Sequence, residues 1–161
     1  ADGIRLINAS RYLAIVATNQ PVLARGECSF EELDRIHRKM ETDLGMHGAY
    51  IDDLYFCPHH PDRGYNGEVP ELKIDCNCRK PKIGMLTKAA NKYNIDLSKS
   101  WYIGDTTTDI QTGINAGMHT VLIKTGEAGK DGKYHVKANY EAENLLEAVN
   151  HILSVSGEQE Q

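Results

Sequence analysis

Apolar and polar residues follow one another along the chain in blocks that predict strands and helices in turn. Residues 13–17, LAIVA, are continuously apolar, which is typical of a strand buried on both faces of a parallel sheet. Residues 50–56, 101–103 and 120–123 are further short segments that we predict to be strands. Because the strands alternate with helices, the pattern indicates an α/β fold with a mostly parallel sheet.

The helices are predicted from apolar residues that recur every three or four positions. The first helix opens with Ser29-Phe-Glu-Glu32, a capping-box sequence, and its apolar stripe continues through Leu33, Ile36, Met40 and Leu44. We expect further helices over residues 85–93, 109–116 and 142–153. The polar segment 154–161 is predicted to be a frayed tail.

Length and charge limit the classes of protein to consider. A chain of 161 residues favours one domain, which we place at residues 1–153. The net charge of -5 argues against a nucleic-acid partner. The longest apolar run, residues 13–17, is too short to cross a bilayer, and no basic-then-apolar leader opens the sequence. We therefore predict a cytoplasmic protein with no membrane partner.

Three of the four cysteines lie in the irregular segment 57–78. Cys57 and His59 are separated by one residue, and so are Cys76 and Cys78. Three thiolates and one imidazole are a ligand set for tetrahedral, structural zinc. The prolines and glycines between the two pairs disfavour regular structure, so a metal ion would offset the entropy of ordering this loop. We predict a zinc loop over residues 57–78.

The cysteine pattern leaves alternatives open. Four cysteines can make two disulfides, but Cys76 and Cys78 flank a single residue and are badly placed to bridge each other, which favours reduced thiolates. His60 competes with His59 as the imidazole ligand; we favour His59 because its spacing matches that of the second pair. An unliganded thiol cluster in a flexible loop is the structural alternative, and Cys28 reads as an ordinary small residue.

Polar residues follow two predicted strands at their carboxyl ends, where chemistry gathers in parallel sheets. Thr18 and Asn19 end the first strand, and a hydroxyl there suits a phosphate oxygen, although both can simply terminate the strand. Asp105 and Asp109 follow the strand 101–103 and suit Mg²⁺, although Asp109 can equally cap the next helix.

Arg79 and Lys80 follow the last cysteine of the loop directly. A metal-ordered loop would therefore position two cations. The alternative interpretation is a solvated basic pair on the surface.

These motifs resemble those of a known superfamily. TNQ at residues 18–20, Lys80-Pro81 and GDTTTD at residues 104–109 resemble, in this order, motifs II, III and IV of the haloacid dehalogenase (HAD) superfamily. CPHH, CNCRKP, GML and TNQPVLARGE narrow the resemblance to the D-glycero-D-manno-heptose 1,7-bisphosphate phosphatase family, from about Asp2 to Leu153. Histidinol-phosphate phosphatase shares the zinc loop and is the close alternative.

The resemblance implies a Rossmann-like three-layer fold and a capless phosphatase that hydrolyses the 7-phosphate of its phosphorylated sugar through an aspartyl-phosphate. It implies that Thr18 holds the transferring phosphoryl group and that Lys80 neutralises its charge. Asp105 would ligate catalytic Mg²⁺ with support from Asp109, beside the structural Zn²⁺. The substrate contacts that the resemblance implies are Asn19, Arg79 and Arg25, with Arg79 suited to the second phosphate.

One motif of the family is not found in the 161 residues. Motif I, an apolar strand ending in Asp-x-Asp-Gly-Thr, should precede Thr18, and Asp2-Gly3 does not match it because no second acid lies two residues away. The resemblance therefore predicts a chain without its nucleophile and acid/base aspartates, inactive as it stands.

The missing motif has a structural consequence. The family's central strand, between the strands ending at Thr18 and Asp105, would be absent. Three outcomes follow: the sheet closes the gap, a second chain fills it, or the missing segment belongs to a larger polypeptide, which we favour. A non-catalytic zinc-stabilised module of a fused nucleotidyltransferase is the alternative function.

Overall fold

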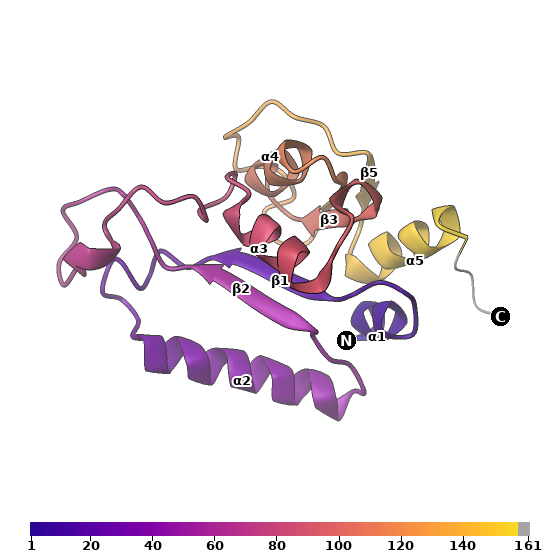
Figure 1. Cartoon of the computed structure of the whole chain (residues 1–161), viewed down its shortest axis with the longest axis horizontal. Coiled ribbons are helices and arrows are strands. Elements are labelled where there is room, and N and C mark those ends of the chain that lie inside the picture. The colour runs from indigo at the N-terminus through magenta and orange to yellow at the C-terminus, as the bar shows by residue number, and fades with distance from the viewer. Residues whose placement is uncertain (158–161) are drawn as a thin grey trace.

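The structure, a computed structural model, describes residues 1–157 and has the expected α/β architecture (Figure 1). Helices and strands alternate over most of the chain. In order they are α1 (Asp2–Asn8), β1 (Ile15–Asn19), α2 (Phe30–Met46), β2 (Asp53–Cys57), α3 (Gly84–Tyr93), β3 (Trp101–Gly104), α4 (Thr107–Asn115), β4 (His119–Ile123), β5 (Tyr140–Ala142) and α5 (Leu145–Val155).

All the strand pairs are parallel, as the alternating pattern predicts. β1 pairs with β2 from Ile15 opposite Asp53 to Asn19 opposite Cys57. β3, β4 and β5 form a second sheet in that order, with Trp101 opposite His119 and Val121 opposite Tyr140. The prediction of a mostly parallel α/β fold is confirmed.

Two elements of the carboxyl-terminal region differ from the sequence prediction. Ala142 was expected to begin the last helix but ends the short strand β5. α5 then runs through Val155, which lies in the predicted polar tail. Residues 156 and 157 of that tail form a turn, and residues 158–161 lie outside the described residues. Two 3₁₀ turns, Pro70–Leu72 and Leu97–Lys99, were not predicted.

α2 begins at the predicted capping box. The backbone N–H of Glu32 donates to Ser29 Oγ at 3.1 Å, and the Glu32 carboxylate accepts from the N–H of Ser29 at 2.7 Å. These two bonds satisfy two of the donors that a helix start leaves free. The predicted apolar stripe is buried at Leu33, but Ile36 is 59% exposed.

The best-buried core lies in the second sheet. Val121, Ala142, Ala148 and Ile152 are 0–5% exposed and pack together between β4, β5 and α5. α5 also packs against α1, so the first helix is held by the carboxyl-terminal half of the chain (Figure 1). No helix within residues 1–157 combines the length and the apolar character needed to cross a membrane.

The two sheets are not joined by a hydrogen-bonded ladder among the described residues. Within residues 1–157 β1 pairs only with β2, and the Tyr102 hydroxyl on β3 donates to the carbonyl of Ala17 at 3.4 Å. The prediction that residues 13–17 are buried on both faces is therefore wrong: Leu13 is 44% exposed and Ile15, Val16 and Ala17 are only half-buried. The physical reason is that one edge of β1 lacks a neighbouring strand.

The unequal burial of the two sheets predicts that truncating a valine to alanine lowers the free energy of unfolding by different amounts in each. Val121→Ala should lower the free energy of unfolding by about 2 kcal/mol, because the side chain is fully buried and its removal leaves a cavity. Val16→Ala, on the half-buried β1, should cost less than half as much. Urea denaturation of residues 1–161 measures both, and equal losses would contradict the uneven burial of the two sheets.

Candidate active site and metal centre

The carboxyl ends of β1 and β2 bring the predicted phosphate residues next to the first cysteine. Asn19 lies directly opposite Cys57 in the parallel register. The N–H of Gln20 continues this pairing by donating to the carbonyl of Cys57 at 2.8 Å. The Gln20 side chain turns back and donates to Thr18 Oγ1 at 3.3 Å. The strand end and the start of the cysteine loop are thus one continuous structure.

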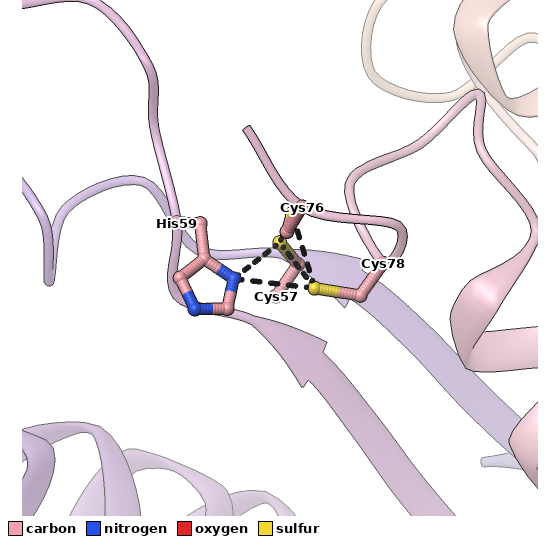
Figure 2. Close-up of side chains that lie close together, drawn as sticks. All are labelled: Cys57, His59, Cys76 and Cys78. Atoms are coloured by element: carbon pink, nitrogen blue, oxygen red, sulfur yellow. Dashed lines mark hydrogen bonds between the residues drawn. The ribbon is translucent and has the colours of Figure 1, made fainter. Parts of the chain in front are cut away.

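Four donor atoms converge in this loop. Cys57, His59, Cys76 and Cys78 each direct one ligand atom to a common centre, and these atoms lie within 4.8 Å of one another (Figure 2). The sulfur of Cys78 lies 3.0 Å from that of Cys57 and 3.3 Å from that of Cys76. His59 presents Nδ1, at 3.3 Å from Cys78 Sγ. This set of three thiols and one imidazole could hold a metal ion.

The other histidine takes no part in this cluster. His60 is buried, and its Nε2 lies 3.3 Å from the Arg25 guanidinium. The cluster therefore contains the histidine that the matched spacing favours.

Burial changes the acidity of the cysteines. Burial raises the pKa of the Cys57 thiol, and hydrogen bonding with Cys78 raises it further. Burial is also the largest cause of the raised pKa of Cys78. A metal cation reverses this preference because it binds and stabilises the thiolate form. The third thiol differs: burial opposes its ionisation, but hydrogen bonds with Cys78 and Cys57 lower the pKa of Cys76.

Asn19 fixes the backbone of Lys80. Its side-chain Oδ1 accepts the N–H of Lys80 at 3.0 Å, and its Nδ2 donates to the carbonyl of Lys80 at 3.5 Å. One amide side chain thus binds both backbone polar groups of a residue 61 positions away. In this structure Asn19 positions Lys80. Its contact with substrate stays a prediction.

Asp109 binds the other end of Lys80. The Lys80 ammonium donates to Asp109 Oδ1 at 2.6 Å, and both side chains are largely buried. Asp109 Oδ2 accepts the N–H of Thr106 at 3.3 Å, and Thr106 Oγ1 accepts the N–H of Asp109 at 3.1 Å, which completes a capping box for α4. The sequence allowed two roles for Asp109, capping the helix or supporting Mg²⁺. The structure shows the helix cap, and the support of Mg²⁺ stays a prediction.

Asp105 is held by hydrogen bonds from the loop after β4. Its Oδ2 accepts the N–H of Glu127 at 2.9 Å, and its backbone carbonyl accepts the N–H of Gly129 at 2.7 Å. Gly126 permits this approach: its φ is +71°, and a Cβ there would lie 2.2 Å from Asp105 Oδ2. The Asp105 carboxylate is thereby fixed at the end of β3.

The two arginines predicted to contact substrate lie against the cysteine loop. Arg79 donates to the backbone carbonyl of His59 at 3.4 Å. Arg25 lies in the turn after β1, where its guanidinium is bonded to His60 and stacks over Tyr65 at 4.9 Å from the ring centroid. The predicted site residues thus come from the ends of β1, β2 and β3, from the turn after β1, from the loop between β2 and α3, and from the start of α4.

Comparisons with known proteins give the family of the chain. A family model described as HAD-hydrolase-like matches residues 77–148. The chain is 38% identical over 127 residues to D-glycero-beta-D-manno-heptose-1,7-bisphosphate 7-phosphatase of Yersinia pestis, an alignment that covers 78% of this chain and 65% of that protein. The protein of the same name from Pasteurella multocida is 36% identical over 148 residues, covering 91% of this chain and 77% of that protein.

The fold comparison leads to the same proteins. The structure of D,D-heptose 1,7-bisphosphate phosphatase from B. bronchiseptica, complexed with magnesium and phosphate, superposes with a TM-score of 0.80 at 31% identity. It covers 95% of this chain and 80% of the other. The chain belongs to the D-glycero-D-manno-heptose 1,7-bisphosphate 7-phosphatase family. It spans about two thirds of the length of several of these relatives, 65% in the Yersinia pestis protein.

Some residues that shape the site of this heptose bisphosphatase family member were not predicted from the sequence. Asp131 accepts the N–H of Thr107 at 2.8 Å and its hydroxyl at 2.8 Å, which fixes the start of α4 beside Asp105. Burial opposes this charge, but the bonds from Thr107 lower the pKa of the Asp131 carboxyl. Asp131 follows a glycine-rich stretch with no strand or helix pattern, so only the fold shows this contact.

The close approach at Gly126 gives a matched mutational test. Gly126→Ala should destabilise residues 1–161 by about 1–3 kcal/mol more than Gly117→Ala, because both glycines have φ +71° but only the Cβ at 126 meets Asp105. Urea denaturation of the two variants measures the difference. Equal losses of unfolding free energy in the two variants would show that residue 126 is not in close contact with Asp105.

Proposed function

We propose that this chain is the phosphate- and metal-binding part of a sugar bisphosphate phosphatase that hydrolyses the 7-phosphate of D-glycero-D-manno-heptose 1,7-bisphosphate. The names of the relatives give the substrate. The observation that carries the proposal is the double fixation of Lys80: Asn19, at the end of β1, binds its backbone, and Asp109, near the start of α4, binds its ammonium.

The proposed roles follow from these contacts. The Thr18 hydroxyl donates to the transferring phosphoryl group, and the Lys80 ammonium neutralises its charge. The Asp109 carboxylate accepts a hydrogen bond from the Lys80 ammonium. When a phosphoryl group binds, its oxygens compete with Asp109 for the N–H groups of Lys80. Asn19 acts through the position of Lys80 as well as on the substrate, and the forked guanidinium of Arg79 binds a phosphate oxygen pair.

Two metal sites belong to this proposal. Asp105, with Asp109 behind it, offers hard oxygen ligands that suit Mg²⁺, which supplies neutralisation of phosphoryl charge when bound. Cys57, His59, Cys76 and Cys78 would hold Zn²⁺ with no open position, so that ion orders the loop and does not react. Free thiols at all four cysteines support a reducing, cytoplasmic location.

The facing edges of β1 and β3 are the proposed place of a further strand. The 161 residues contain no Asp-x-Asp sequence. A parallel apolar strand between β1 and β3 would pair their open edges, and two aspartates at its carboxyl end would lie next to Thr18, Lys80 and Asp105. We propose that an additional segment of the polypeptide, or a second chain, supplies this strand with the nucleophile and the acid/base.

The absence of this motif within the 161 residues also favours a second candidate, a non-catalytic zinc-stabilised module that assembles with a nucleotidyltransferase domain. Such a module needs neither a phosphate site nor a Mg²⁺ site. Measurements of phosphate release therefore distinguish the non-catalytic module from the phosphatase.

Phosphate release tests the catalytic proposal. With Mg²⁺ and heptose 1,7-bisphosphate, residues 1–161 should show no turnover, whereas the same residues preceded by an apolar strand ending in Asp-x-Asp-Gly-Thr should be active. Lys80→Met in the longer form should lower kcat by about 10²–10³-fold, since it removes charge stabilisation. A folded, metal-loaded longer form that stays inert would favour the binding module, and faster turnover of histidinol phosphate would assign that substrate instead.

Metal analysis tests the zinc proposal. Purified residues 1–161 should contain about one zinc per chain, as four ligands for one ion require. Cys76→Ser should lower the zinc content and the Tm, because it removes one of four ligands. Cys28→Ser is the matched control, since Cys28 lies outside the cluster, and it should change neither quantity. Full zinc content in Cys76→Ser would refute the assigned ligand set.

A further inference from the structure

The β4–β5 loop, residues 124–139, binds the junction between β3 and α4. Two of its backbone N–H groups reach Asp105: that of Glu127 donates to the carboxylate Oδ2 at 2.9 Å, and that of Gly129 donates to the backbone carbonyl at 2.7 Å. The N–H of Tyr134 donates to Thr107 Oγ1 at 3.2 Å. Three backbone donors of one loop therefore bind the short segment from Asp105 to Thr107.

The Asp131 carboxylate adds two bonds to this set. Its Oδ1 accepts the N–H of Thr107 and its Oδ2 accepts the Thr107 hydroxyl, each at 2.8 Å. Thr107 is buried and is the first residue of α4, where backbone N–H groups have no partner within the helix. Asp131 thus attaches the loop to the helix two residues after Asp105.

The backbone of the loop needs such contacts to keep its conformation. Gly126 and Gly129 have φ of +71° and +75°, and Ala128 between them has φ +50°, a conformation that is unfavourable for a residue with a Cβ. A conformation of this kind persists where surrounding contacts hold it. The bonds to Asp105 and Thr107 are therefore needed to keep the N–H groups of the loop pointed at Asp105.

One oxygen of the two acids at this strand end is free. Asp109 accepts from Lys80 at Oδ1 and from the N–H of Thr106 at Oδ2, and Asp105 Oδ2 accepts from Glu127. Among the described residues no group donates to Asp105 Oδ1. Because the bond at Oδ2 sets the rotation of the carboxylate, the loop also sets the direction of Oδ1. This oxygen is the one that a cation can bind.

We propose that Asp131 is a positioning residue of the cation site: by binding Thr107 it holds the β4–β5 loop in place, and the loop orients Asp105 Oδ1 toward a divalent cation. The inference rests on the proposed function for the role of Asp105 in binding Mg²⁺. Residues that hydrogen-bond to a metal-binding group and orient it typically change metal affinity by about 10–100-fold. The alternative is that Asp131 stabilises the start of α4 and has no effect on cation binding.

Manganese binding tests the positioning role without turnover. In NMR spectra of zinc-loaded residues 1–161, paramagnetic Mn²⁺ should broaden amide signals next to Asp105, and a titration gives its dissociation constant. Asp131→Ala should raise this constant by about tenfold or more. Asp131→Asn should recover most of the affinity, because an amide can accept the Thr107 N–H and donate to Thr107 Oγ1. Thr107→Val should have a smaller effect than Asp131→Ala, because it removes only the hydroxyl.

Asp96→Ala is the matched control. Asp96 also accepts both the N–H and the hydroxyl of one residue, Ser98, the N–H at 3.0 Å. It lies before β3, whereas Asp105 lies after it, so the two acids are at opposite ends of this strand. Asp96→Ala should lower the Tm and leave the Mn²⁺ dissociation constant unchanged.

Amide exchange without added cation tests the first step of the proposal. In Asp131→Ala the N–H groups of Glu127 and Gly129 should exchange at least about tenfold faster than in the unaltered protein, because the loop is no longer attached to α4. The amide of Val121 in β4 should keep its protection, which shows that the variant is folded. Asp96→Ala should change none of these rates.

The outcomes separate this inference from the proposed function. If Asp131→Ala binds Mn²⁺ as tightly as the unaltered protein, or if Asp96→Ala weakens binding equally, the positioning role is refuted and the cation site stands. An Asp131→Asn variant as weak as Asp131→Ala would also refute it, since the geometry of the bonds would not matter. If Mn²⁺ broadens no signal near Asp105 in the unaltered protein, the Mg²⁺ site of the proposed function is overturned. The exchange rates of Glu127 and Gly129 then decide whether Asp131 holds the loop.

Discussion

The convergence of three sulfurs and one imidazole nitrogen is the constraint on which the candidate site depends. It joins the two ends of the segment from Cys57 to Cys78, which contains only a short 3₁₀ turn of regular structure. Ordering such a segment costs conformational entropy that few apolar contacts offset here, because most of residues 61–67 are exposed. The cluster of three cysteines and His59 therefore determines where the residues directly after Cys78 lie.

Among those residues, Lys80 is also held by contacts outside the loop. Asn19 binds the backbone of Lys80, and Asp109 binds its ammonium. The lysine is thus positioned by the end of β1 and by the start of α4, which lie on either side of the gap between the two sheets. The Lys80 ammonium, which would contact a phosphoryl group, is therefore fixed without any bound ligand. Electrostatic catalysis requires such preorganised charges.

Much of this arrangement could be predicted from the sequence, because local patterns determine it. The capping box at Ser29 and the alternation of strands and helices are local signals, and the structure agrees with them. The burial of β1 was predicted wrongly, because burial depends on a neighbouring strand and not on the apolar run itself. Contacts between distant segments also escaped prediction: Asp131 with Thr107, and Asn19 with Lys80, have no spacing pattern.

Amide exchange at Lys80 tests most directly whether the metal-binding loop positions the phosphate site. The Lys80 N–H is bonded to Asn19 Oδ1 at 3.0 Å, so it should exchange slowly in the zinc-loaded protein. Removal of the metal with a chelator should speed its exchange at least tenfold, while the amide of Val121 in the second sheet keeps its protection. Unchanged protection at Lys80 in the metal-free protein would contradict the account.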